Sequence, residues 1–567
     1  MVSLFNALNI SSNALTVNES AISVVSHNVA NMNTEGYSKQ KVNLATRNIA
    51  GAIGDSTEAQ VRANGGVMIA NIMRYNNSYL NNYYRDQLSV LKGYEAELEG
   101  LGDLADVFND LEGTGITAAL ENFYKAINNL NEYPASSTAR VNFIESAKTL
   151  TANLNSKSAQ LKELTSKALG DGESRELLET SKIYNAYSVF NDKLEELAEV
   201  NKALQITQTG TLQANNLLDQ RDMILNDIAQ SVDINIEENP QNGSVTLYIG
   251  GQEIVKGAEV VGELSIQTAK EFCQSQNPPI SYPDEWVTAE GKPREAAVIS
   301  IVSRSNDGTI TPIVADANSI IRGGSLGGLL HSTDTDIDGM NPGKAMDALN
   351  SVAVTIANLF NKLNTDEDAY CINPNDTTKL MKTNPDNYIF GNLVPKLDPN
   401  TNQQVIDPVT GDPVYELEKI TAANISVNSN LLTDKGIWNI ACAHFDNPNN
   451  LDPPPTFNEN AIGNAQNVVL MLGTRNAKVA ELGNMSVEDF YTGLLGKVAA
   501  SGSNMDTLVE TQTSVVDSIH NKILSNNSVD INEELVDLVK YQTAYSAAAK
   551  VFTTCNSCLD TLMALGG

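Results

Sequence analysis

The sequence has no long hydrophobic run, since no stretch approaches the roughly 18–20 uninterrupted apolar residues that a membrane-spanning helix needs. Its first segment, MVSLFNALNISSNAL, contains no lysine or arginine and no small-residue cleavage site after an apolar core. Neither a membrane span nor a cleaved secretory signal peptide is therefore expected. Taken alone, these two absences predict a cytoplasmic protein.

Basic residues are scarce. The chain of 567 residues carries 37 Lys and Arg against 69 Asp and Glu, which gives a net charge of −32. A surface of that sign repels the phosphates of nucleic acids and of anionic lipids, so no nucleic acid and no membrane is expected as a partner. A solvated acidic exterior is the simplest interpretation, and a charge that keeps free subunits apart is the alternative.

Cysteine is rare and its count is odd. The five cysteines are Cys273, Cys371, Cys442, Cys555 and Cys558. Only the last two lie close in sequence, three residues apart in a helical pattern, where a disulfide would strain the backbone. A zinc or redox site would need a second ligand pair or a βαβ context, and the sequence offers neither. We expect these two as helix-surface residues, with no metal and no cofactor.

Both ends of the chain carry apolar residues at helical spacing. The N-terminal stripe consists of Leu4, Leu8, Leu15, Ile22, Val25 and Val29, and the C-terminal stripe of Leu535, Leu538, Gln542, Tyr545, Ala549, Phe552, Leu559 and Leu562. Asp530 can cap the C-terminal helix, with Glu533 in the position of a capping box. Isolated helices are marginal in water. We therefore expect the two terminal helices to pair, and to complete their burial against neighbouring chains.

The interior changes character along its length. Residues 78–230 are mostly helical in pattern, with breaks at Gly113–Gly115, Pro134 and Gly170–Gly172. From Val232, apolar residues alternate at period two around the turn sequences NPQNG and SNDG, which predicts β-hairpins.

A second helical stretch is predicted over Lys344–Leu363, and a third ends near Ser525–Asn527. Between them, residues 365–460 are rich in Asn, Pro and Asp and predict a loop-heavy outer region.

The chain is too long for one hydrophobic core, so several domains are expected. We predict a mainly α, multidomain α+β protein whose long terminal helices form a coiled coil. The expected division is a terminal helical assembly domain (1–60 with 525–567), a helical bundle (61–231 with 323–364 and 465–524), a β-rich insertion (232–322) and a loop-rich outer region (365–464).

Three interior motifs could suggest chemistry. DTDIDG at Asp334–Gly339 has the carboxylates and glycine of an EF-hand loop, but Ala345 stands where a bidentate Glu belongs, so a polar turn is favoured. GGSLGGLL at Gly323–Leu330 lacks the Lys-Ser/Thr of a phosphate-binding loop and predicts tight turns. The pair Arg221–Asp222 in LLDQRD could be catalytic, although an ion pair that fixes helix packing is favoured. No catalytic site is expected.

Both chain ends resemble the axial protein family of the bacterial flagellum, which comprises rod, hook and hook-associated proteins and flagellin. The segment HNVANMNTEGYSKQKVNL resembles the N-terminal signature of that family through Asn28, Ala30, Asn31, Thr34, Gly36, Tyr37, Ser38 and Gln40. Glu35 and Lys39 depart from the residues usual there. VDINEELVDLVKYQTAYSAAAKVFTT resembles the C-terminal signature through Glu533, Glu534, Leu538, Gln542, Tyr545, Ala547 and Ala549.

Motifs in the interior of the chain make the resemblance specific to one part of this family. LLDQRD at Leu217–Asp222 is similar to a motif that hook-associated proteins share with flagellins and that is not typical of hook or rod proteins. GGSLGGLL and ITAANISVNSNL at Ile420–Leu431 also look like hook-associated proteins. Most of residues 232–322 and 365–460 shows no such similarity.

The resemblance implies a structural, non-enzymatic subunit of the hook–filament junction that self-assembles helically through its terminal helices. Its assembly interface would comprise the two apolar stripes together with Asn31, Gly36 and Tyr37. The implied partners are further copies of the chain, the hook protein, a second junction protein and a cytoplasmic export chaperone on the C-terminal helix.

Family members leave the cell unfolded through the flagellar type III apparatus, so the resemblance implies an extracellular protein without a cleaved signal. The alternatives are another axial protein, such as flagellin or a hook protein, or a binding or enzymatic module in the middle insertion.

Overall fold

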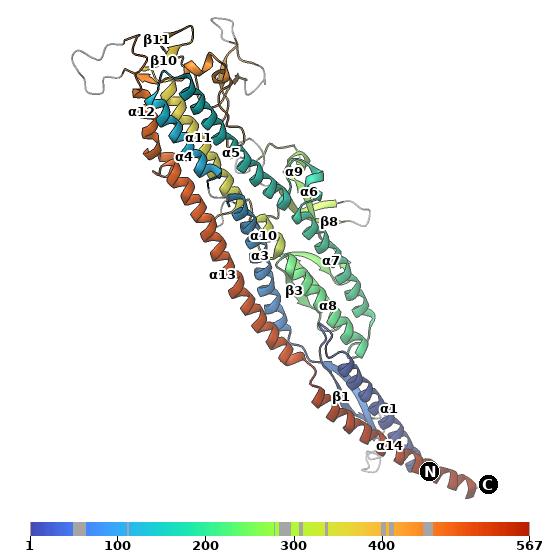
Figure 1. Ribbon diagram of the computed structural model, residues 1–567. Coiled ribbons are helices and arrows are strands. Elements are labelled where there is room, and N and C mark those ends of the chain that lie inside the picture. The colour runs from blue at the N-terminus through green and yellow to red at the C-terminus, as the bar shows by residue number, and fades with distance from the viewer. Residues whose placement is uncertain are drawn as a thin grey trace.

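The chain forms an elongated molecule whose two termini lie at the same end (Figure 1). The computed structural model describes residues 2–48, 64–109, 113–276, 278–282, 296–304, 310–334, 338–397, 404–406, 413–445 and 458–565. Among these residues, no helix is both long enough and apolar enough to cross a bilayer.

Helices dominate the described chain. They are α1 (Val2–Ala30), α3 (Ser78–Phe108), α4 (Gly115–Glu132), α5 (Ser137–Leu169), α6 (Arg175–Glu179), α7 (Lys182–Ile206), α8 (Leu212–Ser231), α9 (Ala269–Ser275), α10 (Gly324–Leu330), α11 (Pro342–Asn364), α12 (Gln466–Gly473), α13 (Val487–Asn527) and α14 (Ile531–Leu565), with 3₁₀ turns η2 (Ser429–Leu432), η3 (Gly436–Asn439), η4 (Thr474–Asn476) and η5 (Ala480–Leu482). The helix breaks predicted at Gly113–Gly115, Pro134 and Gly170–Gly172 are present. Side-chain caps fix many of the helix starts, as Ser486 does for α13.

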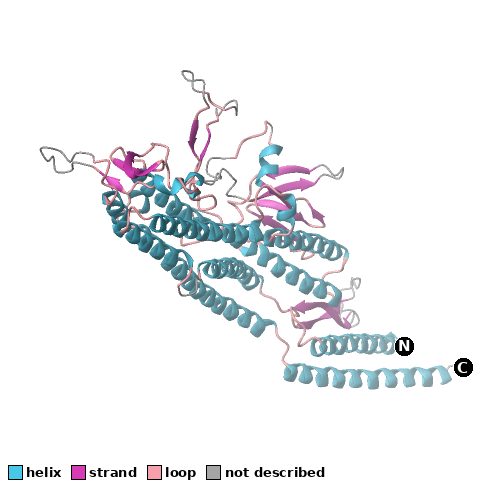
Figure 2. Ribbon diagram, turned by 45° about the horizontal axis from the view of Figure 1, so that its top comes forward, coloured by secondary structure: helices cyan, strands magenta, loops and turns pink. Residues whose placement is uncertain are grey.

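The strands form small antiparallel sheets (Figure 2). They are β1 (Gln40–Asn48) with β2 (Asn64–Arg74); β3 (Asn235–Glu238), β4 (Val245–Ile249), β5 (Gln252–Lys256) and β6 (Glu259–Val260); β7 (Glu263–Thr268), β8 (Ala297–Arg304) and β9 (Ile310–Val314); β10 (Ala369–Asn373), β11 (Asp376–Lys382) and β14 (Ala443–His444); and β12 (Leu393–Pro395) with β13 (Tyr415–Leu417). The mainly α, α+β class predicted from the sequence is confirmed.

The body contains two hydrophobic cores that follow one another along its length. The core far from the termini joins α4, α5 and α11 to the start of α13, through side chains such as Phe123, Phe143 and Phe360. The core nearer the termini joins α7 and α8 to the β3–β9 strands, through side chains such as Phe190 and Leu247. Helix α5 contributes to both cores, so it ties the two halves of the body together.

The β-rich insertion is packed on the helices. Its first hairpin runs from β3 to β4 around NPQNG as predicted, while the predicted second turn, at residues 305–309, lies outside the described residues. The buried amide of Asn201 on α7 accepts from Val245 N at 2.9 Å and donates to Gly257 O at 2.8 Å. These bonds fix the insertion to α7.

The predicted loop-heavy region contributes directly to the far core. Phe390 is fully buried and its ring lies 6.1 Å from that of Phe360 on α11. The side-chain oxygen of Asn361 accepts from Ile389 N and from Phe390 N, both at 2.8 Å. This segment therefore closes the end of the helical body as part of its core.

At the opposite end, α1, α14 and the β1–β2 ribbon form what we call the terminal module. Helix α1 packs on α14 and on the ribbon, around Ala21, Val24, Val25, Val42 and Tyr541. The sequence division assigned residues 64–74 to the bundle, but β2 pairs with β1 and lies on α1. The cross-strand pairing with β1 determines the position of β2, and a single-strand pattern does not reveal its partner.

Candidate assembly interface

Asn28, near the end of α1, holds the terminal module together. Its side chain is 1% exposed, and its Nδ2 donates to Gln40 O at 2.8 Å and to Glu534 Oε2 at 2.9 Å. Its Oδ1 accepts from the Tyr37 hydroxyl at 2.7 Å and from Gln40 N at 3.1 Å. One amide therefore joins α1, the start of β1 and α14, with every polar position used.

The three signature residues predicted to lie in the interface make contacts within the chain. Asn31 Nδ2 donates to His27 O at 3.0 Å and so binds the carbonyl end of α1. Gly36 has φ of 75°, and a Cβ there would lie 2.5 Å from Met223 Cγ, so the turn favours glycine. Burial, assisted by the charges of Asp219 and Glu534, raises the pKa of Tyr37 far above its usual value.

Lys39 connects the module to α13 and α14. Its backbone N–H donates to Asn527 O at 2.8 Å, at the last residue of α13. Its Nζ contacts Glu533 and lies 3.5 Å from Glu534 Oε1. Burial acts to lower the pKa of Lys39, but the two carboxylates outweigh it and raise that pKa. Asp530 accepts from Asn532 N at 2.8 Å, as predicted for a cap of α14.

The face of α1 that packs inside the module differs from the predicted stripe. Its buried residues are Ser11, Val17, Ala21, Val24, Val25 and Asn28, whereas Leu4, Leu8, Leu15, Ile22 and Val29 are half-buried. Small and polar side chains (Ser11, Ala21 and Asn28) are buried beside the valines, and a search for large apolar residues at helical spacing does not find them. Only Val25 of the predicted stripe is buried.

On α14, the side chains that turn toward α1 include Glu534, Leu538 and Tyr541. Of the predicted C-terminal stripe, Leu538, Ala549, Phe552 and Leu559 are half-buried, while Leu535, Gln542, Tyr545 and Leu562 are exposed.

Several apolar side chains remain exposed on one side of α14. Val536 is 68% exposed, Val539 is 62% exposed and Val551 is 50% exposed. Val536 stands two residues beyond Glu534, about half a turn around the helix, and therefore faces away from α1. Leu44, Met68 and Met73 of the ribbon are also exposed, at 41–47%. Large apolar side chains exposed in this number are typical of a protein-binding surface.

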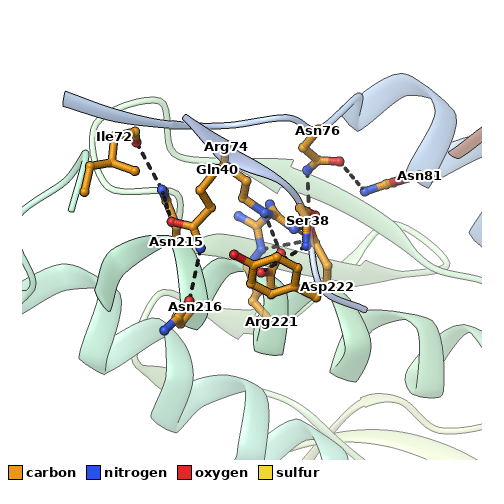
Figure 3. A network of polar contacts seen from close by, with 12 residues as sticks. Ser38, Gln40, Ile72, Arg74, Asn76, Asn81, Asn215, Asn216, Arg221 and Asp222 are labelled. Carbon is orange, nitrogen blue, oxygen red and sulfur yellow. Dashed lines mark hydrogen bonds and ion pairs between the residues drawn. The ribbon is translucent and has the colours of Figure 1, made fainter. Parts of the chain in front are cut away.

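Between the terminal module and the body lies what we call the polar junction, formed by Gln40, Arg74, Arg85, Asn215, Asp219, Arg221 and Asp222. Figure 3 labels Gln40, Arg74, Asn215, Arg221 and Asp222 of this set, where β1 and β2 cross the N-terminal half of α8. Asn215 Nδ2 donates to Gln40 Oε1 at 2.9 Å and to Ile72 O at 3.0 Å. The module is thus bound to α8 by hydrogen bonds to both strands.

Two carboxylates of the LLDQRD motif complete the polar junction. Arg74 donates from Nε to Asp219 Oδ1 and from Nη2 to Asp222 Oδ2, each at 2.7 Å. Arg221 Nη2 and Arg85 Nη2 reach the other oxygen of Asp222, at 2.8 Å and 3.1 Å. Asp222 therefore receives three guanidinium groups, one each from β2, α3 and α8.

The charges of these groups are set by one another. Burial by itself raises the pKa of Asp222, but Arg221, Arg74 and Arg85 outweigh it and hold that pKa well below its usual value. Burial raises the pKa of Asp219, opposed by Arg74. The Arg221–Asp222 pair is thus part of a buried ion network that fixes helix packing, as the favoured interpretation predicted.

The glycines of GGSLGGLL allow α10 to approach its neighbours. Gly324 has φ of 70°, and a Cβ on Gly328 would lie 2.3 Å from Gly93 O of α3. The DTDIDG motif precedes α11 and lies only partly within the described chain, because residues 335–337 are outside it. Asn341, which follows the motif, caps α11: its side-chain oxygen accepts a hydrogen bond from Lys344 N at 2.8 Å.

Three family descriptions match this chain. "Flagellar hook-associated protein FlgK helical domain" matches residues 101–369. "Flagella basal body rod protein" matches residues 8–37, and "Flagellar basal body rod FlgEFG protein C-terminal" matches residues 521–565. The last two ranges fall on α1 and on the end of α13 with α14, the segments that build the terminal module.

Full-length relatives and one solved structure are similar to the chain. "Flagellar hook-associated protein 1" of Bacillus subtilis is 25% identical over 586 residues, covering all of both proteins. The protein of the same name from Salmonella typhimurium is 21% identical and covers 98% of this chain and 99% of the relative. The fold resembles that of the flagellar hook junction protein FlgK from Burkholderia pseudomallei, with a TM-score of 0.53 at 13% identity, over 78% of this chain and 99% of that one.

Proposed function

We propose, from its similarity to flagellar hook-associated proteins, that the chain is a structural subunit of the hook–filament junction of the bacterial flagellum. Its mechanism would be polymerisation, with no bond made or broken. The apolar side chains left exposed on α14, on the side turned away from α1, carry this proposal. A single chain does not bury these side chains, so their burial requires contact with a neighbouring chain.

The terminal module would form the inner wall of the assembly. Its apolar face would pack against the same module of neighbouring copies, in repeated contacts that generate an open helical lattice. The predicted interface residues Leu535, Tyr545 and Leu562 lie exposed on α14, where neighbouring chains can reach them. Asn31, Gly36 and Tyr37 would act indirectly, by holding α1 and the ribbon in place.

The body would face outward. Its acidic exterior, which dominates a net charge of −32, would keep free subunits apart until their terminal modules meet. Its neighbours along the axis would be the hook protein on one side and the second junction protein on the other.

Before assembly, the exposed face of α14 would need protection. An amphipathic helix of this kind suits capture in the groove of a cytoplasmic chaperone. The chain would then leave the cell unfolded through the flagellar export apparatus, without a cleaved signal, and fold at the growing tip.

Localisation in intact flagella tests the proposal. Immuno-electron microscopy should give a narrow band between hook and filament, and label along the whole filament would indicate a flagellin instead. Deletion of Met1–Asn33 or of Ile531–Gly567 should abolish incorporation while the body stays folded and soluble. Filaments that still incorporate either truncated chain would refute assembly through the terminal helices.

A further inference from the structure

Cys371 lies on β10, and Cys442 directly precedes its partner strand β14, at the end of the body far from the termini. In the β10–β14 pairing, Ala369 opposes His444 and Tyr370 opposes Ala443. One further step along each antiparallel strand brings Cys371 opposite Cys442, with both side chains on the same face of the sheet. The two cysteines are 71 residues apart in sequence, and the loop-rich outer region lies between them.

The hydrogen bonds define which kind of pair this is. Phe445 N donates to Asp368 O at 3.0 Å, so that position is a hydrogen-bonded pair and the pair types alternate from there. Cys371 and Cys442 therefore form a non-hydrogen-bonded pair, consistent with Cys442 O accepting from Asn467 N at 3.0 Å, away from β10. Such pairs have Cα atoms about 4.5 Å apart, within the roughly 4.4–6.8 Å that a disulfide spans.

Both thiols share one buried environment. Cys371 is 2% exposed and Cys442 is 3% exposed. The fully buried Arg140 of α5 lies beside them, with its Nη2 3.1 Å from Cys442 Sγ. The charge of Arg140 acts on both cysteines, which places the two thiols on the inner face of the sheet.

We propose that Cys371 and Cys442 form a cross-strand disulfide when the chain folds in an oxidising environment. The thiolate of one cysteine attacks a small-molecule disulfide, forming a mixed disulfide and releasing one small thiol. The thiolate of the other cysteine then attacks the protein sulfur, forming the Cys371–Cys442 bond and releasing the second small thiol. Two protein thiols are oxidised, one small disulfide is reduced, and the two protons pass to the released thiolates.

The timing follows from burial. In the folded chain, burial raises the pKa of Cys371 to about 11, despite the opposing charge of Arg140, and also raises the pKa of Cys442. Thiolate is the attacking species, so the folded pair reacts slowly and the bond forms while the strands are pairing. The inference rests on the proposed function only for its compartment: a chain that folds outside the cell meets oxidants that the cytoplasm lacks.

The bond would stabilise the outer region. Closing a long loop restricts the unfolded chain, and the stabilisation increases with loop length. The bond would then link the sheet covalently outside the cell, where cytoplasmic chaperones do not act.

Refolding of the full-length chain tests the chemistry without reference to the flagellum. Denatured, reduced protein is refolded in a buffer of reduced and oxidised glutathione, alkylated and digested without reductant. The expected result is one linked peptide pair joining Cys371 and Cys442, with alkylatable thiols falling from five to three. Five free thiols, or a link through Cys273, Cys555 or Cys558, would overturn the proposal.

Three further measurements sharpen the test. Oxidant added after folding should produce the link at least tenfold more slowly than oxidant present during folding, and equal rates would refute formation during strand pairing. The oxidised protein should melt at a higher temperature than the reduced protein, and Cys371→Ser should remove that difference whereas Cys273→Ser should keep it. Alkylation of flagella and cytoplasm should find the pair linked only outside the cell, and reduced thiols in assembled flagella would contradict the inference while leaving the proposed function intact.

Discussion

Asn28 of α1 donates a hydrogen bond to Glu534 of α14 at 2.9 Å, across 506 positions of sequence. Both side chains are buried, at 1% and 3% exposure. This contact joins the two segments that match the rod-protein families, and it explains why an asparagine stands in a mostly apolar helix face. A short amide that binds two backbone groups, a hydroxyl and a carboxylate fixes the pairing of the terminal helices more specifically than apolar contact can.

Asn28→Ala should loosen the terminal module. The change leaves Tyr37, Gln40 and Glu534 with buried polar groups that lack their partner, each costing about 1–3 kcal/mol. Hydrogen–deuterium exchange should increase in α1 and at the start of α14, with the body unchanged. Exposed Asn33→Ala is the matched control. Unaltered exchange in α1 and at the start of α14 in the Asn28→Ala variant would show that Asn28 does not hold the module.

Asp222→Asn should destabilise the whole chain. It leaves Arg74, Arg85 and Arg221 as buried cations with one carboxylate fewer, and breaking a buried ion pair costs about 3–5 kcal/mol. Urea denaturation should show the loss as a lower midpoint. Asp227→Asn, on the exposed side of the same helix, should change the midpoint little. Equal effects of the two substitutions would contradict the role of the polar junction.

Gly328→Ala should separate α10 from α3. The added methyl group would meet Gly93 O at 2.3 Å, and backbone has to move, at a cost of about 1–3 kcal/mol. Gly102→Ala on α3 has open space around it, so it should be neutral or stabilise the helix by about 0.5–1 kcal/mol. In thermal melts, Gly328→Ala should therefore lower the melting temperature, whereas Gly102→Ala should leave it unchanged or raise it.

The pair His331–Glu97 should make stability depend on pH. His331 Nδ1 lies 2.5 Å from Glu97 Oε1, and this hydrogen bond outweighs burial and raises the pKa of His331. Because the folded-state pKa is raised, the stabilisation is fully present below the unfolded pKa of about 6.5 and is lost as pH rises through the folded pKa. Denaturation midpoints measured from pH 6 to 9 should fall for the wild type, and Glu97→Gln should flatten this part of the profile.

Val536→Glu combined with Val539→Glu should block assembly without unfolding the chain. Both side chains are exposed on the side of α14 away from α1, so the charges cost nothing in the monomer. In the polymer they would be buried and unpaired. Circular dichroism should be unchanged while flagella lose the subunit. Val189→Glu on α7, an equally exposed site on the body, should assemble normally.

Local patterns in the sequence predicted much of the secondary structure. The helices, their breaks at glycine and proline, and the hairpin around NPQNG are determined by residues that are close together in sequence. A local sequence pattern therefore includes the residues that determine them. The pairing of β2 with β1 depends on a contact across an intervening segment, which no single-strand pattern reveals.

The buried face of α1 was not predictable from apolar spacing. Ala21 and Asn28 are buried on that face, although neither is a large apolar residue. The predicted stripe of larger residues lies at the edge of that face. The sequence predicts the Arg221–Asp222 ion pair, but Arg74 and Arg85 come from distant segments and can be assigned only from the fold.

The terminal module joins an early segment of the chain, α1, to a segment that is synthesised much later, α14. Asn28 has no Glu534 to bind until 506 further positions have been translated. A chain cut short by a premature stop or by proteolysis would keep most of its body but could not build the module. Under the proposed function, this contact would provide quality control, because a chain that lacks α14 could not enter the polymer.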